Sequence, residues 1–178
     1  QGEPVEIVRP VENRYVDRVR GELTRPFIIV PAVSIKLSEN ALLFASPKPR
    51  VISAEVTAHT ANASGTLSLQ IPQGWRITPA ERTFQIAEPG QVAALEFTIT
   101  PPAASARGEI TATARVGQSV ISSGLQQIAY EHIPPQTILP AIHTRMVRED
   151  VKVNAHRIGY VMGAGDEVPD ALREITWF

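Results

Sequence analysis

Histidine and serine side chains are the first residues of this chain to consider for metal binding or for attack on a substrate. The four histidines are His59, His132, His143 and His156, and no HxH, HxxxH or HExxH spacing joins any of them. The serines at 122–123 do not complete the GxSxG pattern that forms the nucleophile elbow of a serine hydrolase. The sequence therefore predicts no catalytic residue and no metal ligand. The alternative that remains is a metal site whose ligands are distant in sequence and come together only in the folded chain.

A second candidate is the glycine turn Gly163-Ala164-Gly165, which precedes a predicted helix and resembles a phosphate-binding loop. The third glycine of the dinucleotide-binding GxGxxG pattern is replaced by Val168. A tight strand-to-helix turn also needs small residues, and Asp166 is placed to cap the helix by accepting hydrogen bonds from its first N–H groups. We interpret this segment as a structural turn.

Trp75 is the aromatic residue with two opposed interpretations. An exposed tryptophan on a β-sandwich can stack on a sugar ring, and Trp75 with Tyr130 or Phe44 would then form a carbohydrate-binding platform. However, Trp75 follows Ile71 and precedes Ile77 on the same face of an alternating pattern, which predicts a buried ring. We favour burial, and the carbohydrate site at Trp75, Tyr130 and Phe44 is the alternative.

The composition of the chain argues against several classes of partner. The net charge is −1 and the isoelectric point is about 6.5, so there is no electrostatic case for binding nucleic acid or an anionic membrane. No apolar run approaches the roughly 20 residues needed to span a bilayer. The absence of cysteine excludes disulfides and thiolate zinc sites but does not indicate a compartment. We expect no nucleic acid and no membrane as partner.

A hydrophobic pattern with a period of two runs through residues 27–132. Apolar and polar residues alternate most clearly in the segments 66–71, 92–99 and 109–116. Turn sequences fall between the segments at 62–65, 88–90 and 116–118. Strands that recur at this short spacing are typical of a sandwich rather than of βαβ units. We predict a mainly β fold, an immunoglobulin-like antiparallel β-sandwich of about seven strands.

The segment before the sandwich, residues 1–26, combines prolines with charged residues and reads as a linker. Its apolar residues Val11, Tyr15 and Val19 recur every four positions. That spacing permits a short amphipathic helix of roughly 8–10 residues, although an extended linker with one or two helical turns is the simpler interpretation.

The segment after the sandwich, residues 133–178, begins as a proline-rich connector. It continues with a polar-alternating strand over 145–153 and then a strand, glycine turn and helix, which is how a parallel α/β domain begins. A single such unit leaves apolar residues without neighbours. We therefore expect this truncated unit to dock on the sandwich or on a second copy of the chain, as a homodimer.

The central pattern resembles a known family. It consists of the run LSLQIPQGWRITP from Leu67 to Pro79, then Phe84, Gly90 and the run FTITPP at 97–102. This pattern is similar to the NPCBM-associated β-sandwich module, also called the alpha-galactosidase-associated domain, and the similarity covers residues 50–116. Such modules accompany bacterial carbohydrate-active enzymes, so the resemblance implies a structural role rather than a catalytic one.

The flanking segments resemble the interdomain region of large bacterial PIG-L (LmbE-like) de-N-acetylases. The similar segments are Glu22–Phe27, Tyr130–Thr137 and Ile158–Pro169. The resemblance implies a zinc-dependent deacetylase domain upstream and a glutamine-amidotransferase-like α/β domain that begins near Ile158. The Ala-His-Pro-Asp-Asp zinc motif of the catalytic domain does not occur here. The resemblance thus implies zinc for the upstream domain and no cofactor or catalytic residue for this chain.

Together these features predict a non-catalytic accessory domain that spaces or positions its neighbours, and the resemblance implies that the larger protein is a hydrolase acting on N-acetylated sugars. The expected partners are neighbouring domains of the same polypeptide. Export to the periplasm or the cell exterior is implied by the resemblance alone. A carbohydrate-binding module is the alternative, with carbohydrate as an added partner, and an independent hydrolase ranks last.

Overall fold

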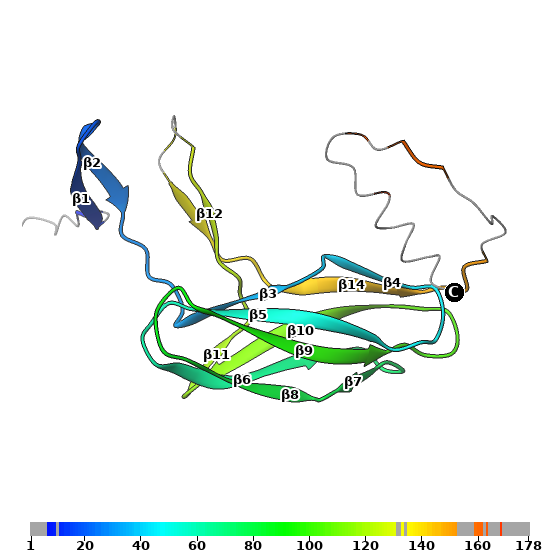
Figure 1. Ribbon diagram of the computed structural model, residues 1–178. Coiled ribbons are helices and arrows are strands. Elements are labelled where there is room, and N and C mark those ends of the chain that lie inside the picture. Colours follow the sequence, from blue (N-terminus) through cyan, green and yellow to red (C-terminus); the bar gives the residue numbers. More distant parts are fainter. Residues whose placement is uncertain are drawn as a thin grey trace, which may run out of the picture.

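Two β-sheets pack face to face in the computed structural model of the protein, which describes residues 7–9, 11–130, 133, 135–152, 159–161, 163 and 168 (Figure 1). One sheet has the order β3 (Val33–Leu37), β5 (Arg50–Ala58), β9 (Val92–Thr100), β7 (Arg76–Thr78). The other has the order β4 (Ala41–Phe44), β14 (His143–Arg148), β10 (Ala106–Val116), β6 (Ala63–Gln70), β8 (Glu81–Ile86), and β11 (Ser119–Ile121) also pairs with β10. The predicted β-sandwich is confirmed.

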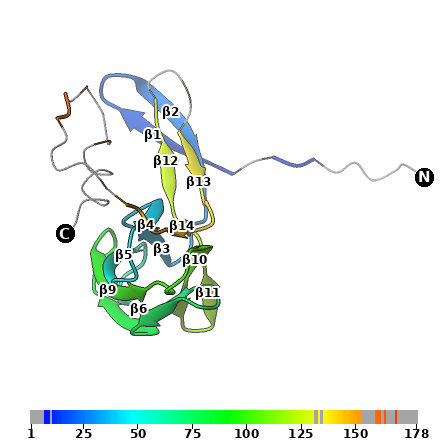
Figure 2. The ribbon, with the colours of Figure 1, turned by 90° about the vertical axis from the view of Figure 1, so that its right-hand side faces the viewer.

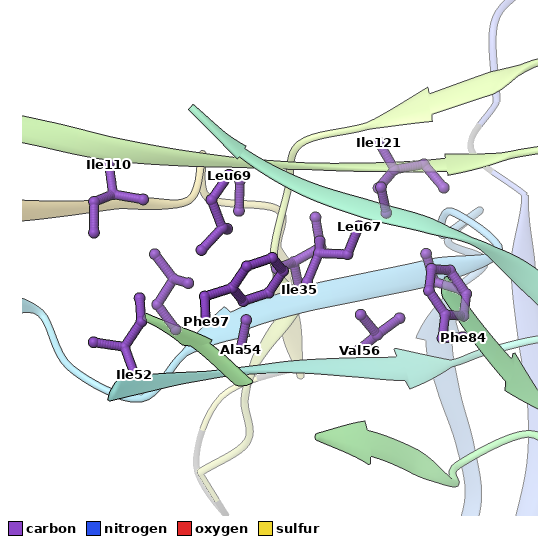
Figure 3. Packing of buried hydrophobic residues seen from close by; sticks show 14 of the residues in the cluster. Ile35, Ile52, Ala54, Val56, Leu67, Leu69, Phe84, Phe97, Ile110 and Ile121 are labelled. Carbon is purple, nitrogen blue, oxygen red and sulfur yellow. The ribbon is translucent and has the colours of Figure 1, made fainter. Parts of the chain in front are cut away.

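The core lies between the two sheets and is filled by the inward-facing residues of the alternating segments. Figure 3 shows Leu67, Leu69 and Ile110 from one sheet meeting Ile52 and Phe97 from the other. Each of these side chains is at most 5% exposed. Burying an aliphatic or aromatic side chain of this size contributes about 1.5–3 kcal/mol, so the alternation read from the sequence marks the residues that hold the sheets together.

The turns between strands follow the glycine signals. Gly90 and Gly117 have positive φ angles of 85° and 57° in the turns expected at 88–90 and 116–118. The turn expected at 62–65 comes earlier, at residues 59–62, where Asn62 takes a φ of 55°. Asparagine tolerates this left-handed conformation better than other non-glycine residues, so β6 can begin already at Ala63.

The first strand of the sandwich is shared between the two sheets. β3 pairs with β5 in one sheet, and after the bend at residues 38–40 the chain continues as β4 in the other. β4 pairs in parallel with β14, which pairs antiparallel with β10 on its other side. The β4–β14 pair is an exception to the all-antiparallel prediction. β14 also lies after residue 132, in the segment interpreted as a connector, yet it is an inner strand of a sandwich sheet.

Two small hairpins stand apart from the sandwich sheets. The first pairs β1 (Glu12–Asp17) with β2 (Gly21–Pro26), and the second pairs β12 (Gln126–Ile128) with β13 (Gln136–Ile138). Both lie toward the end of the sandwich at which the chain enters β3 (Figures 1 and 2). The end of β14, where the chain leaves, lies at the opposite end in Figure 1.

The helix considered within residues 1–26 is wrong, because the described part of this segment forms the first hairpin. The Asp17 carboxylate accepts hydrogen bonds of 2.8 Å from the backbone N–H groups of Val19 and Arg20, and Gly21 has a φ of 81°. Both hydrogen bonds lower the pKa of Asp17, and the bond from the Arg20 N–H has the larger effect. A spacing of four residues is also two strand periods, so it could not distinguish a helix from a strand.

Most of the predicted C-terminal strand, glycine turn and helix, including Asp166, lies outside the described residues, so its docking stays a prediction. Within the described part of the chain, no helix is long and apolar enough to span a membrane.

Candidate functional site

Trp75 and Phe44 meet at the end of the sandwich where the chain leaves. Gly74, with a φ of 90°, closes a turn in which the Trp75 N–H donates to the Pro72 carbonyl oxygen at 3.3 Å. The ring of Trp75 then packs edge-to-face on Phe44, with centroids 5.2 Å apart and planes at 71°. Trp75 is 6% exposed and Phe44 is 4% exposed. The burial predicted for Trp75 is confirmed, and neither ring offers an open face to a sugar.

Tyr130, the third residue of the carbohydrate alternative, lies elsewhere. Its side chain is 62% exposed, and it follows β12 in the second hairpin. That hairpin projects from the sandwich away from β7, the strand that Trp75 precedes (Figure 1). The structure brings Trp75 and Phe44 together but does not add Tyr130 to them, so the three do not form one aromatic platform.

A buried arginine at the end of β14 was missed by the sequence analysis. Arg148 is 1% exposed, and its Nη2 donates to the Ala103 carbonyl oxygen at 3.3 Å and to the Asp150 carboxylate. A signal existed, because Thr144, Met146 and Arg148 occupy the same inward-facing positions of the alternating strand. An arginine at such a position requires partners, since an unpaired buried charge is costly.

Contacts from several segments hold the chain where it leaves the sandwich. The Glu149 N–H donates to the Phe44 carbonyl oxygen at 3.1 Å, and the Ser105 hydroxyl donates to the Glu149 carboxylate at 3.1 Å. With the bonds of Arg148 to Ala103 and Asp150, they fix residues 148–150 against the 103–105 loop and β4. We call residues 148–150 and their partners the exit clamp.

Two nitrogens of Arg148, Nε and Nη1, have no hydrogen-bond partner among the described residues. These two nitrogens do not share an edge of the guanidinium group, so a single carboxylate or phosphate cannot bind both in bidentate fashion. The arrangement is therefore no anion site of the usual fork geometry. It serves the exit clamp, in which the Nη2 atom makes the charged contact.

One groove lies between the two hairpins, with a volume of about 610 Å³. Asn13, Arg25 and Phe27 line one wall, Gln127 and Thr137 line the other, and His59 lies at its base. The Arg25 guanidinium carbon lies 5.4 Å from the centre of the Tyr15 ring, which holds the cation at the groove by a cation–π contact. The walls carry hydrogen-bonding groups, and the serine that pairs with His59, Ser34, is buried in β3 and does not line the groove.

His59 is held at the groove by Ser34. Its Nε2 lies 2.9 Å from the Ser34 hydroxyl, and Ser34 is 8% exposed. Burial lowers the pKa of His59, because the charged imidazolium loses solvation. Among the described residues, this histidine is a hydrogen-bond partner of β3 and belongs to no group of possible metal ligands.

No group of three or more His, Cys, Asp or Glu side chains that could hold a metal ion occurs among the described residues. His143 lies 3.9 Å from the Glu109 carboxylate on the neighbouring strand, at an exposed position. His132 and His156 fall outside the part of the chain that the structure describes. The described part thus offers a zinc ion no site of this kind.

Comparison with protein families agrees with this architecture. Residues 48–118 match the family described as the NPCBM-associated, NEW3 domain of alpha-galactosidase. The matched segment begins just before β5 and ends after β10, so it covers the middle of the sandwich and less than half of the chain. The match supports the predicted β-sandwich domain. A search of curated proteins found no match.

Several solved structures resemble the chain distantly. The native conformation of E. coli alpha-2-macroglobulin matches with a TM-score of 0.47 and 15% identity, over 72% of this chain and 7% of that one. WR4, a C. elegans MSP family member, matches with a TM-score of 0.38 and 8% identity, over 65% of this chain and 98% of that one. SSP-19, an MSP-domain protein like family member in Caenorhabditis elegans, matches with a TM-score of 0.34 and 8% identity, over 62% of this chain and 92% of that one. Likeness at this level says nothing about function.

Replacing Trp75 by alanine should lower the free energy of unfolding by about 3–5 kcal/mol, because it removes a buried aromatic side chain and leaves Phe44 partly unpacked. The control is Val120→Ala, whose side chain is 64% exposed and for which we expect a change within about 0.5 kcal/mol, as for other exposed side chains. Urea denaturation measures both. A small effect at Trp75 would show that its ring is not part of the core.

His59 should make the stability of the chain depend on pH. Its unfolded pKa is near 6.5, and its folded pKa is lower, so the unfolded chain binds more protons below that pH. The stability that His59 supports is therefore present above about pH 6.5 and is lost as the pH falls toward its folded pKa. In thermal melts between pH 7.5 and 5, the native chain should lose more stability than His59→Gln. Parallel curves for the two proteins would contradict this.

Proposed function

We propose that this chain is a non-catalytic accessory module that holds neighbouring domains of a larger carbohydrate-active enzyme at a fixed separation. The observation that carries the proposal is the path of the chain, which enters the sandwich at one end and leaves it at the other (Figure 1). A module with this path keeps the domain before it apart from the domain after it. Among the described residues, the serine–histidine pair Ser34 and His59 has its hydroxyl on a side chain that is only 8% exposed, which fits a non-catalytic role.

Both ends of this path are fixed to the sandwich by specific contacts. At the first end, Val33 is fully buried, and the Ile35 N–H donates to the Ser123 carbonyl oxygen at 3.1 Å. At the second end, the exit clamp holds residues 148–150. A flexible tether would need none of these contacts, since a polar linker reaches its length without ordering its ends. The contacts favour a rigid spacer.

We propose further that the larger enzyme is a PIG-L (LmbE-like) de-N-acetylase. The support is the resemblance of the segments at 22–27, 130–137 and 158–169 to the interdomain region of such proteins. The alpha-galactosidase named in the matched family supports the coarser proposal, a carbohydrate-active enzyme. In this proposal zinc belongs to the upstream catalytic domain, and the enzyme is exported. In this proposal the chain itself positions the other domains and catalyses no reaction.

The spacer predicts a single distance between the two ends of the module. The chain has no cysteine, so the double substitution Ile29→Cys and Lys152→Cys places two spin labels at exposed positions and nowhere else. β3 and β4 together span twelve residues, from Val33 to Phe44, which is at most about 36 Å at about 3.3 Å per residue. Each label lies four residues beyond one end of this span, because Phe44 is paired with Arg148, so the labels should lie roughly 35–40 Å apart. Double electron–electron resonance should give one narrow distribution near that distance.

A broad distribution would contradict the rigid spacer. The control pair, Val51→Cys and Val92→Cys, carries labels on the paired strands β5 and β9 and reports the width that a rigid sheet gives. Saturable binding on a glycan array, abolished by a substitution that leaves the fold intact, would instead favour the carbohydrate-binding alternative.

A further inference from the structure

The groove between the two hairpins has the volume of a ligand pocket. Both hairpins project from the same end of the sandwich (Figure 1), and the groove between them has a volume of about 610 Å³. Pockets for small molecules in proteins measure roughly 300–1,000 Å³ and place a few polar groups on a mainly apolar lining. The proposed spacing role depends on the sandwich strands and the exit clamp and makes no use of this groove.

The register of each hairpin turns a pair of polar side chains toward the groove. In the first hairpin Asn13 lies directly opposite Arg25, and in the second Gln127 lies directly opposite Thr137. All four residues line the groove. Directly opposed residues of an antiparallel pair point to the same face, so each hairpin presents one such pair to the other hairpin. Sheets that pack on each other have apolar facing side chains instead, so this polar lining is suited to a ligand.

Apolar side chains line the groove where the hairpins join the sandwich. Phe27, Ile28 and Val30 follow β2, and Leu125 precedes β12. Phe27 is 63% exposed and Ile28 is 41% exposed. The groove thus combines polar walls with an apolar base, which matches a ligand that has a polar head and an apolar body.

Arg25 is the charged side chain of the groove at neutral pH. The described lining residues include no aspartate or glutamate, and the other ionisable residue among them is His59. Burial lowers the pKa of His59 from 6.5, so its imidazole is mostly uncharged at pH 7. In the described part of the chain, Arg25 makes a cation–π contact with Tyr15 and no ion pair. Its positive charge therefore has no counter-charge in the groove.

The contact with Tyr15 leaves the hydrogen-bonding edges of Arg25 available. A guanidinium group stacks on an aromatic ring through its flat face, whereas its five N–H donors lie in its plane. Tyr15 does not line the groove, and the Asn13 amide lies beside Arg25 as a further donor. Guanidinium groups bind a carboxylate or a phosphate through two parallel hydrogen bonds. This wall of the groove is therefore suited to an anionic group.

We propose that the groove binds a small ligand that carries an anionic group, a carboxylate or a phosphate, on an apolar body. Arg25 and Asn13 hold the anionic group, and Gln127 and Thr137 donate hydrogen bonds from the opposite wall. The apolar body lies against Phe27. Such a ligand bridges the two hairpins, each of which is marginally stable as a two-stranded sheet.

Amide chemical shifts of the isotope-labelled chain test the site, with benzoate as the probe. Benzoate has a carboxylate on an apolar ring, and benzamide is its uncharged match. Benzoate should shift the amides of Asn13, Arg25, Phe27 and Gln127 in a saturable way, and benzamide should bind at least about tenfold more weakly because it lacks the charge. Phenyl phosphate distinguishes the two anionic groups: tighter binding than benzoate supports a phosphate site, and weaker binding supports a carboxylate site.

Arg25→Gln should weaken the binding of benzoate about tenfold or more. The matched control is Arg14→Gln, which should change the affinity less than about twofold, because Arg14 points to the other face of β1 and lies 3.2 Å from Glu22. Where Arg25→Gln disrupts the first hairpin by removing the contact with Tyr15, Thr137→Val on the second hairpin decides. It removes one hydroxyl and should weaken binding about threefold.

Equal affinity for benzoate and benzamide would overturn the proposal, because the charge of Arg25 would then play no part. Binding of benzoate that is unchanged in both Arg25→Gln and Thr137→Val would also overturn it, as would the lack of a saturable shift with either anionic probe at millimolar concentration. Binding of N-acetylglucosamine at the same amides that is tighter than that of benzoate would replace it with a carbohydrate site. None of these outcomes affects the spin-label distance, so the spacer is tested separately.

Discussion

The insertion of β14 between β4 and β10 is the constraint on which the rest of the structure depends. Among the described strands β4 pairs only with β14, and the pair aligns Phe44 with Arg148, residues about a hundred positions apart in the sequence. Closing so long a loop costs conformational entropy. This cost is offset by the burial of Thr144 and Met146 and by the hydrogen bonds that β14 makes with β10 and with β4. Once β14 is in place, the Phe44–Trp75 contact and the exit clamp are set beside each other.

The path of the chain results from the same insertion. Because β14 runs parallel to β4, it leaves the sandwich at the end opposite to the start of β3. An antiparallel last strand at that position would have returned the chain to the end at which it entered. In this fold the parallel β4–β14 pair is what gives the first and last strands the same direction and so separates the two ends.

The sequence predicted what depends on local pattern and missed what depends on distant pairing. The alternation around Leu67, Phe97 and Ile110 located the buried faces, and the positions beside Trp75 indicated its burial. The role of β14 was missed because nothing local in 143–148 shows that its neighbours are β4 and β10. The first hairpin was missed because the spacing of Val11 and Tyr15 fits both periods, and the Asp17 and Gly21 turn was the signal that decides between them. Arg148 was missed because its burial depends on the partner strands.

The most direct measurement is the rate of amide hydrogen exchange along β14. If β14 closes the sandwich, the amides of Met146 and Val147 should exchange as slowly as those of Leu67 and Leu69 in β6, since all open only when the whole domain unfolds. Exchange at Met146 and Val147 that is orders of magnitude faster than in β6 would contradict this. β14 would then open without unfolding of the rest of the sandwich, and the fixed separation of the two ends would lose its structural basis.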